Sequence, residues 1–269
     1  FETREKMRHS AVMISMILAA AAAQAQEATP TNPPTEAAGM LEEVVVTAQK
    51  REERLQEVPI AITAMNSEAL MDHGITDLEG VIKSTPSMAF SHYPPTSNTL
   101  SIYMRGTGVV DAGQITVDSA VGIYQDGFYI SRGQMVTFDL ADVERVEVLR
   151  GPQGTLYGRN TTGGAVNLIS KKPSGEFGYK QEIGFGNNGR FRSLSVIDLP
   201  QWGGLSAKVS VLKRGKDGYV KNLGSTHDFG EENQTAGRLA LRWDTGGPFT
   251  ADYFYERGDL DSTPLYFTN

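Results

Sequence analysis

The histidines are the first side chains to consider for catalysis or metal binding, and they are few and scattered. The 269-residue sequence has four of them, His9, His73, His92 and His227, and it has no cysteine. No His-x-x-x-His pair, Gly-x-Ser-x-Gly turn or phosphate-binding glycine loop occurs in it. These are the patterns that hold zinc, activate a serine or bind a nucleotide. The sequence therefore predicts no catalytic residues, no metal site and no cofactor, and we expect that the protein is not an enzyme.

A short β-branched segment could instead act through its backbone. Residues 41–48 read LEEVVVTA, between a Thr-, Pro- and Ala-rich stretch (26–40) and a charged run (49–57). Consecutive valines favour a strand. With no hairpin partner expected nearby, such a strand would leave its backbone groups open to the sheet of another protein. An ordinary edge strand of the domain that follows explains the residues equally well.

The elements that would position this segment form a small mixed α/β domain over residues 49–173. We expect a strand at 58–64, a helix capped by Ser67 that ends at Gly74, and a second helix that begins with a capping box from Thr76 to Glu79 and stops before Pro86. Short strands are expected at residues 100–105, 121–124, 143–149 and 165–170. Asp126-Gly127 predicts a tight turn after the second of these four.

From residue 174 the helical periodicity ends, and apolar and polar residues alternate. The alternation runs through residues 181–185, 205–211, 238–243 and 249–256, with a hairpin turn at Asn188-Gly189. Short turns at 200–204 and 245–248 contrast with a long polar loop at 213–235. Strands of about ten residues with one apolar face predict part of an antiparallel transmembrane β-barrel. A soluble β-sandwich would show similar alternation.

The N-terminal residues indicate export. Met7 begins a short basic segment, an apolar run follows from Ala11 to Ala23, and Ala23-Gln24-Ala25 has the small-x-small pattern of a signal-peptidase site. We expect residues 1–25 to comprise upstream residues and a signal peptide, with a flexible linker at 26–40. The formal net charge of −7 argues against nucleic acid as a partner, because phosphate binding needs clustered cations.

Three segments together resemble the plug domain of TonB-dependent receptors of the Gram-negative outer membrane. They are EEVVVTAQKREERLQEVPIAITA (42–64), IYMRGTG (102–108) with VGIYQDGFY (121–129), and VERVEVLRGPQGTLYGRNTTGGAVNLISKKP (143–173). The resemblance is strongest over the third segment and weaker over the strands that follow it. It implies a plug (49–173) inside a barrel of about 22 strands, of which residues 174–269 would supply the first strands.

The resemblance also implies partners and a function. TonB, energised by its inner-membrane complex, would pair with a TonB box at 41–48 and drive uptake of a small-molecule substrate, such as a ferric siderophore, across the outer-membrane lipid. The TonB-binding residues would be Glu43, Val44, Val45, Val46, Thr47 and Ala48. Arg105 and Arg150 would form ionic contacts with glutamates of the barrel wall, because an unpaired buried charge is costly.

Further residues are assigned by the same resemblance. The glycines of the plug motifs are expected to allow tight turns and close packing; they are Gly106, Gly151, Gly154, Gly158, Gly163 and Gly164. Substrate contacts are expected at the apices of the plug, from Tyr93, Asp111 and Asp118.

The length departs from the family pattern. Fewer than 100 residues follow Pro173, enough for about five strands. We expect a fragment, either a partial sequence, a truncated product or a non-functional remnant, that would not transport alone. The other function considered, an outer-membrane signalling receptor, would need a folded domain before the TonB box, and the stretch at 26–40 is too short for one.

Overall fold

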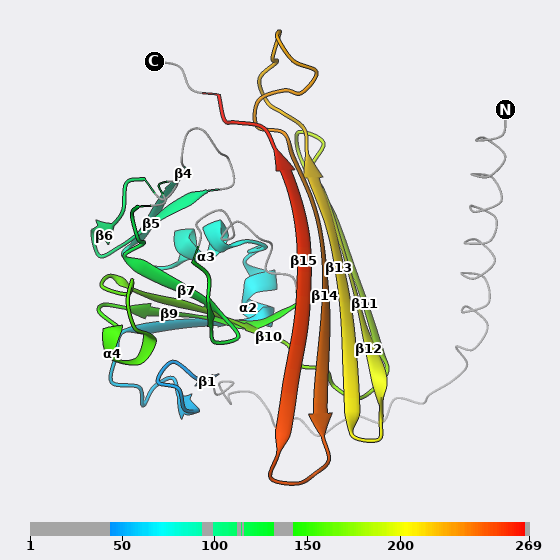
Figure 1. Cartoon of the computed structure of the whole chain (residues 1–269). Helices are drawn as coiled ribbons and strands as arrows, with labels where there is room; N and C mark the ends of the chain where they lie inside the picture. Colours follow the sequence, from blue (N-terminus) through cyan, green and yellow to red (C-terminus); the bar gives the residue numbers. More distant parts are fainter. Residues whose placement is uncertain (1–43, 93–98, 112–113, 115, 132–141, 267–269) are drawn as a thin grey trace, which may run out of the picture. The chain divides into compact units, whose positions relative to one another are not determined.

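The computed structural model describes residues 44–92, 99–111, 114, 116–131 and 142–266 (Figure 1). The predicted signal peptide and linker, with Glu43 and Tyr93, lie outside these residues. No helix among the described residues is long and apolar enough to cross a membrane.

The smaller domain is built on a five-stranded mixed sheet in the order β3-β9-β10-β7-β8. Its strands are β3 (Ile62–Asn66), β7 (Val121–Gln125), β8 (Phe128–Tyr129), β9 (Val143–Arg150) and β10 (Gly164–Ser170). β10 pairs parallel with β7 and antiparallel with β9. A second sheet holds β4 (Met88–His92), β5 (Leu100–Met104) and β6 (Thr107–Gly108). The predicted α+β domain is confirmed, including the Asp126-Gly127 turn between β7 and β8, where both φ angles are positive.

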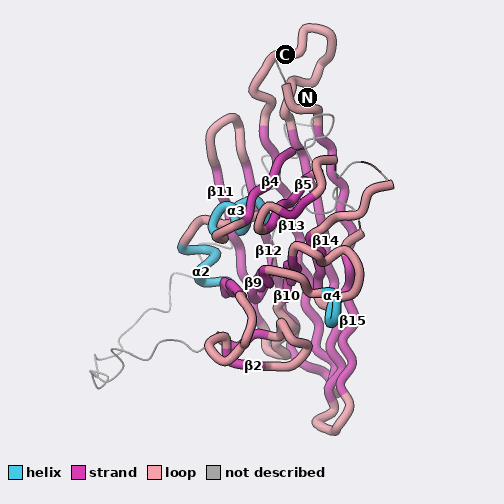
Figure 2. The backbone as a smooth tube through the Cα atoms, turned by 90° about the vertical axis from the view of Figure 1, so that its left-hand side faces the viewer, coloured by secondary structure: helices cyan, strands magenta, loops and turns pink. Residues whose placement is uncertain are grey.

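Three short helices lie in the described part of this domain, and Figure 2 shows none in the larger sheet. They are α2 (Ser67–Asp72), α3 (Leu78–Ser84) and α4 (Gly154–Tyr157). Leu78, Val81 and Ile82 of α3 are buried in the main core, as their spacing on one helix face predicts. Burial of this kind contributes about 2 kcal/mol per large aliphatic side chain.

Both predicted helix caps were wrong by one residue. Asn66, rather than Ser67, caps α2 by accepting a hydrogen bond from the backbone N–H of Ala69 (2.8 Å). Asp77, rather than Thr76, caps α3 by accepting from Gly80 N–H (2.9 Å). All four residue types can cap a helix, so the choice depends on where the preceding chain turns. The strand expected at 58–64 is likewise displaced, because β3 pairs with β9 from Ile62 to Asn66.

The larger sheet is an antiparallel meander of five long strands in sequence order (Figure 1). They are β11 (Gly178–Phe185), β12 (Phe191–Trp202), β13 (Leu205–Lys216), β14 (Glu232–Asp244) and β15 (Thr250–Ser262). The sheet is open, and we call it the wall. Strands β13 and β14 extend further than predicted, so the long loop spans residues 217–231.

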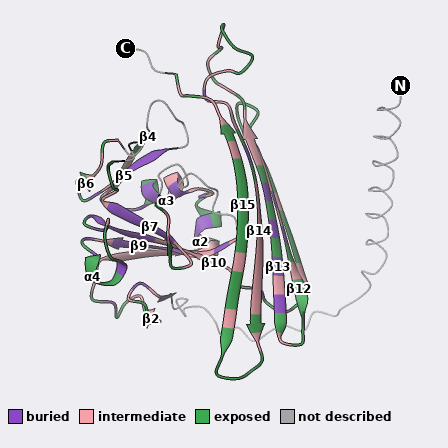
Figure 3. Ribbon diagram, viewed as in Figure 1, coloured by how far each residue is buried: buried purple, intermediate pink, exposed green. Residues whose placement is uncertain are grey.

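Burial in the wall is the reverse of that in a soluble sheet. On β13 the polar residues Ser206, Lys208 and Ser210 are buried, whereas Val209 and Val211 are exposed. Figure 3 shows purple buried segments in β7 and β9 and a mostly green, exposed β15. A sandwich would cover its apolar face with a second sheet, so this pattern fits a transmembrane barrel wall and contradicts the β-sandwich alternative.

Candidate functional site

The segment predicted to couple to TonB forms one strand of a hairpin. β1 (Val45–Val46) pairs antiparallel with β2 (Glu53–Arg54). The expectation of no partner nearby was therefore wrong. The partner lies within the charged run at 49–57, and Lys50, with a positive φ of 63°, allows the chain to turn back after only a few residues.

This pairing leaves one edge of β1 open. Leu55 N–H donates to Val44 O (2.9 Å), so Val44 and Leu55 form a hydrogen-bonded pair. Because such pairs alternate along an antiparallel ladder, the N–H and C=O of the next residue, Val45, point away from β2. Within the described residues, β2 is the only strand that pairs with β1. Val45 thus offers a donor and an acceptor on the open edge.

Thr47 closes the end of that open edge through a buried carboxylate of β9. Its backbone N–H donates to Glu147 Oε1 (2.7 Å), and its hydroxyl lies 3.2 Å from the same oxygen. Arg145 Nε also donates to Glu147 Oε1 (2.9 Å), while Arg145 Nη2 reaches the Thr47 hydroxyl (3.2 Å). Glu147 is completely buried, and a buried carboxylate is tolerated only with such partners.

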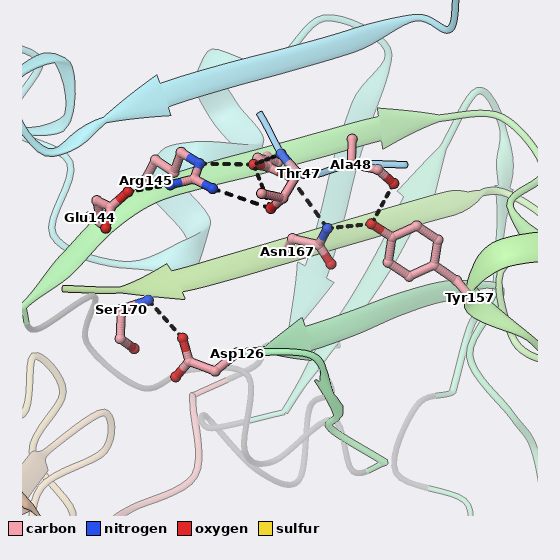
Figure 4. A network of polar contacts seen from close by, with 9 residues as sticks. Thr47, Ala48, Asp126, Glu144, Arg145, Tyr157, Asn167 and Ser170 are labelled. Carbon is pink, nitrogen blue, oxygen red and sulfur yellow. Dashed lines mark hydrogen bonds and ion pairs between the residues drawn. The ribbon is translucent and has the colours of Figure 1, made fainter. Parts of the chain in front are cut away.

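Ala48 is held by a second set of contacts, shown in Figure 4. Tyr157 of α4 donates its hydroxyl to Ala48 O (2.8 Å) and accepts from Asn167 Nδ2 (2.5 Å). The Lys50 ammonium lies 4.6 Å from the centre of the Tyr157 ring. Burial raises the pKa of Tyr157 to about 12, against the opposing effect of the Asn167 hydrogen bond. The hydroxyl therefore stays protonated and donates its hydrogen bond to Ala48 O. We call the contacts of Thr47 and Ala48 with Glu147, Arg145 and Tyr157 the latch.

The two Arg-Gly motifs of the plug lie together. Arg105 is exposed, and its guanidinium lies so near Gly151 that a Cβ there would come within 3.1 Å of Nη1. Arg150 is half-buried, and its Nε has no hydrogen-bond partner among the described residues. Neither arginine forms an ion pair within the described part of the chain, so their contacts with barrel glutamates stay a prediction.

The predicted motif glycines divide into three kinds. Gly106, Gly151, Gly158 and Gly164 have positive φ angles. Gly164 is also tightly enclosed, because an added Cβ would lie 2.2 Å from Met104 Sδ and 2.3 Å from Leu149 O. Gly163 has only the close approach, with Ala120 O and Thr107 O each 3.3 Å from an added Cβ. Gly154 shows neither feature, since nothing lies within 4 Å of an added Cβ.

Two of the predicted substrate-binding residues, Asp111 and Asp118, lie in the described part of the chain, and their contacts with Gln114 and Arg159 do not involve the latch. Asp111 accepts from Gln114 Nε2 (2.7 Å). Asp118 lies 4.0 Å from Arg159, and both side chains are exposed. Within the described residues, no group of three His, Asp or Glu side chains could hold a metal ion.

Ion pairs between the plug and the wall were missed by the sequence analysis. Lys208 Nζ of β13, almost fully buried, lies 3.3 Å from Asp142, which precedes β9, and 3.6 Å from Asp198 of β12. Burial raises the pKa of Asp142, and the positive charge of Lys208 only partly offsets this effect. Here the cation is on the wall and the carboxylate on the plug, opposite to the predicted arginine contacts.

A second contact of the same polarity lies on β14 and β15. Arg238 Nη2 of β14 is 2.5 Å from Asp126 in the β7–β8 turn, and Nη1 is 3.0 Å from Glu256. The rings of Phe128 and Phe254 meet edge to face at 5.4 Å. No sequence motif signals either contact, because each joins residues far apart in the chain.

Comparison with known proteins gives one family. Residues 54–165 match the TonB-dependent receptor plug domain. The chain is 30% identical over 205 residues to the pesticin receptor of Yersinia pestis, covering 74% of this chain and 29% of that protein. It is 31% identical over 145 residues to the ferripyoverdine receptor of Pseudomonas aeruginosa, covering 54% of this chain and 17% of that protein.

Among solved structures, the ferric yersiniabactin uptake receptor FyuA of Yersinia pestis superposes with a TM-score of 0.69 at 27% identity. That match covers 76% of this chain and 32% of FyuA. The chain thus spans less than a third of the length of these relatives. The plug sheet, its motifs and the wall all agree with these matches, and the chain belongs to the TonB-dependent receptors.

Proposed function

We propose that the chain is part of an outer-membrane transporter that takes up a ferric siderophore with energy supplied through TonB. The relatives are named as receptors for ferripyoverdine, for catecholate siderophores and for ferric yersiniabactin. The exposed apolar face of β13, with Val209 and Val211, supports a position in lipid. The proposal includes export by a signal peptide within residues 1–25, the linker at 26–40, the plug at 49–173 and the barrel part at 174–269.

The observation that carries the coupling proposal is the open edge of β1. A strand of TonB can add there without displacing β2, using Val45 N–H and C=O. Further along the same edge it must compete with Glu147 for the N–H of Thr47. The latch then sets the resistance that TonB overcomes before the plug can move.

The proposal also covers how the plug is retained in the barrel and where the substrate binds. Arg105 and Arg150 would contact glutamates of the full barrel, and the apices with Tyr93, Asp111 and Asp118 would face the substrate. These three residues are expected on loops, and binding residues commonly lie on loops held by a rigid scaffold.

The coupling is tested by calorimetric titration of the periplasmic C-terminal domain of TonB into the chain folded in detergent micelles. Val45→Pro removes the N–H that faces the open edge and leaves the pairing of Val44 with Leu55 intact. We expect its affinity to fall at least about tenfold. Val45→Thr keeps the N–H and the β-branched shape, and should bind like the unmodified chain. Equal binding by the two variants, or none by the unmodified chain, would contradict the proposal.

A further inference from the structure

Tyr124 of β7 is a buried side chain that supports the latch from within the plug. Its hydroxyl donates to the backbone O of Tyr157 (2.6 Å), and the two rings lie 5.0 Å apart between their centres. Burial raises the pKa of Tyr124, so the hydroxyl stays protonated and remains a donor. The residue that binds Ala48 O is therefore itself held by Tyr124.

Two further features fix the ring of Tyr124 in this position. Gly122, two residues earlier on β7, leaves space for it, because an added Cβ there would lie 2.8 Å from Tyr124 Cε2. The Lys50 ammonium, in the turn between β1 and β2, lies 5.8 Å from the centre of the ring, within the range of a cation–π contact. Tyr124 thus contacts the β1–β2 hairpin directly as well as through Tyr157.

The residues that follow Tyr124 along the chain contact the wall. These contacts are Gln125 with Glu256 (3.1 Å), Asp126 with Arg238 (2.5 Å) and Phe128 with Phe254 (5.4 Å between ring centres). Tyr124 itself pairs with Tyr129 across the β7–β8 hairpin. The support of the latch and the contacts with the wall therefore belong to one small element.

We infer that Tyr124 is a positioning residue that couples docking of Thr47 and Ala48 to seating of the β7–β8 hairpin on the wall. The role of this coupling rests on the proposed function, in which TonB draws the docked segment away. Coupling between two sites is reciprocal, so loosening the wall contact must also loosen the latch. A pull on β1 is thereby passed to an element that holds the plug to the wall.

The test follows amide hydrogen exchange of Thr47 in the full chain folded in detergent micelles, without TonB. Arg238→Met removes the cation that holds Asp126 on the wall, and we expect exchange of the Thr47 N–H to become at least about threefold faster. Arg242→Met is the matched control. Arg242 lies on the same face of β14, and its ion pairs are with carboxylates of the wall. Its loss should leave the exchange rate of Thr47 unchanged.

Tyr124→Phe decides whether the effect passes through this residue. The variant keeps the ring and loses the donor hydroxyl. In that background, Arg238→Met should accelerate exchange of Thr47 by less than about 1.5-fold, because the hydrogen bond that carries the coupling is gone. Asp126 also accepts from Ser170 N–H on β10 (2.8 Å), as Figure 4 shows, and Tyr124→Phe leaves that second route intact. A merely structural Tyr124 would leave the effect of Arg238→Met at its full size.

A reference amide and a second wall variant guard against general loosening and against misfolding. The N–H of Ala69, which donates to the Asn66 cap of α2, should keep its exchange rate in every variant. Phe254→Leu weakens the ring contact of the β7–β8 hairpin with the wall. It should accelerate Thr47 in the same way and replaces Arg238→Met if circular dichroism shows that the latter has lost its sheet content.

Three results would overturn the inference. They are an unchanged exchange rate of Thr47 in the wall variants, an equal acceleration of Ala69 and Thr47, and an effect of the wall variants that is the same with and without the Tyr124 hydroxyl. TonB is absent from these measurements, so each of these results is distinct from a failure of TonB to bind.

Discussion

At the scale of single residues, the latch is a set of polar contacts that must hold and yet release. Tyr157 binds the backbone carbonyl of Ala48, and Glu147 binds both the backbone N–H and the hydroxyl of Thr47. A typical hydrogen bond contributes about 1 kcal/mol net. Several together keep the segment docked, while each alone is weak enough to be broken in turn.

Tyr157→Phe removes the hydroxyl that donates to Ala48 O and keeps the ring under Lys50. Loss of about 1 kcal/mol of local stability should raise the population of the undocked segment about fivefold. Limited trypsin digestion measures this as faster cleavage after Lys50 and Arg51, quantified by mass spectrometry. Tyr179→Phe, whose hydroxyl is exposed on β11, is the control. Unchanged cleavage in Tyr157→Phe would exclude a latch role for the hydroxyl.

At the scale of elements, the plug sheet is held against the wall by cations of the wall. Lys208 forms ion pairs with Asp142 and Asp198. Arg238 forms ion pairs with Asp126 and Glu256. In both cases one carboxylate belongs to the wall and the other to the plug. A single cation shared in this way links the plug sheet to the wall and gives each of these four carboxylates a positively charged partner.

Lys208→Met keeps the length and apolar stem but leaves Asp142 and Asp198 without their cation. We expect a loss of about 3 kcal/mol in the free energy of unfolding at neutral pH, measured by urea unfolding in micelles. Lys213→Met, on the exposed side of the same strand, should change it by less than about 0.5 kcal/mol.

The pH dependence of the stability of Lys208→Met tests whether unpaired charge causes the loss. Burial already raises the pKa of Asp142 in the folded state, and loss of Lys208 raises it further. Because the folded state then binds the proton more tightly than the unfolded state, stability of Lys208→Met should increase as pH falls through the folded pKa. If the loss in free energy of unfolding of Lys208→Met did not depend on pH, its cause would be lost packing instead of unpaired charge.

At the scale of the whole molecule, the sequence predicts the family, the α+β plug and the alternating strands, because motifs and periodicity are local signals. The hairpin turns at Asp126-Gly127 and Asn188-Gly189 are likewise local and were predicted correctly. The reversed burial of β13, which distinguishes a lipid-facing wall from a sandwich, becomes visible only when the plug meets the polar face.

What the sequence did not predict depends on tertiary pairing. A two-residue strand such as β2 leaves no periodicity in a charged run, so the partner of β1 was missed. The Glu147 contact with Thr47 joins residues 100 positions apart. The Lys208 contact with Asp142 also depends on how the wall meets the plug. No local pattern encodes such contacts.

The central claim is that TonB adds a strand to the open edge of β1, and amide hydrogen exchange at residues 45–47 tests it most directly. In the free chain, Thr47 should be protected by Glu147, whereas Val45 should exchange rapidly. On addition of the TonB C-terminal domain, Val45 should become protected. If the exchange of Val45 is already slow in the free chain, or is unchanged in the complex, the open edge of β1 is not where TonB binds.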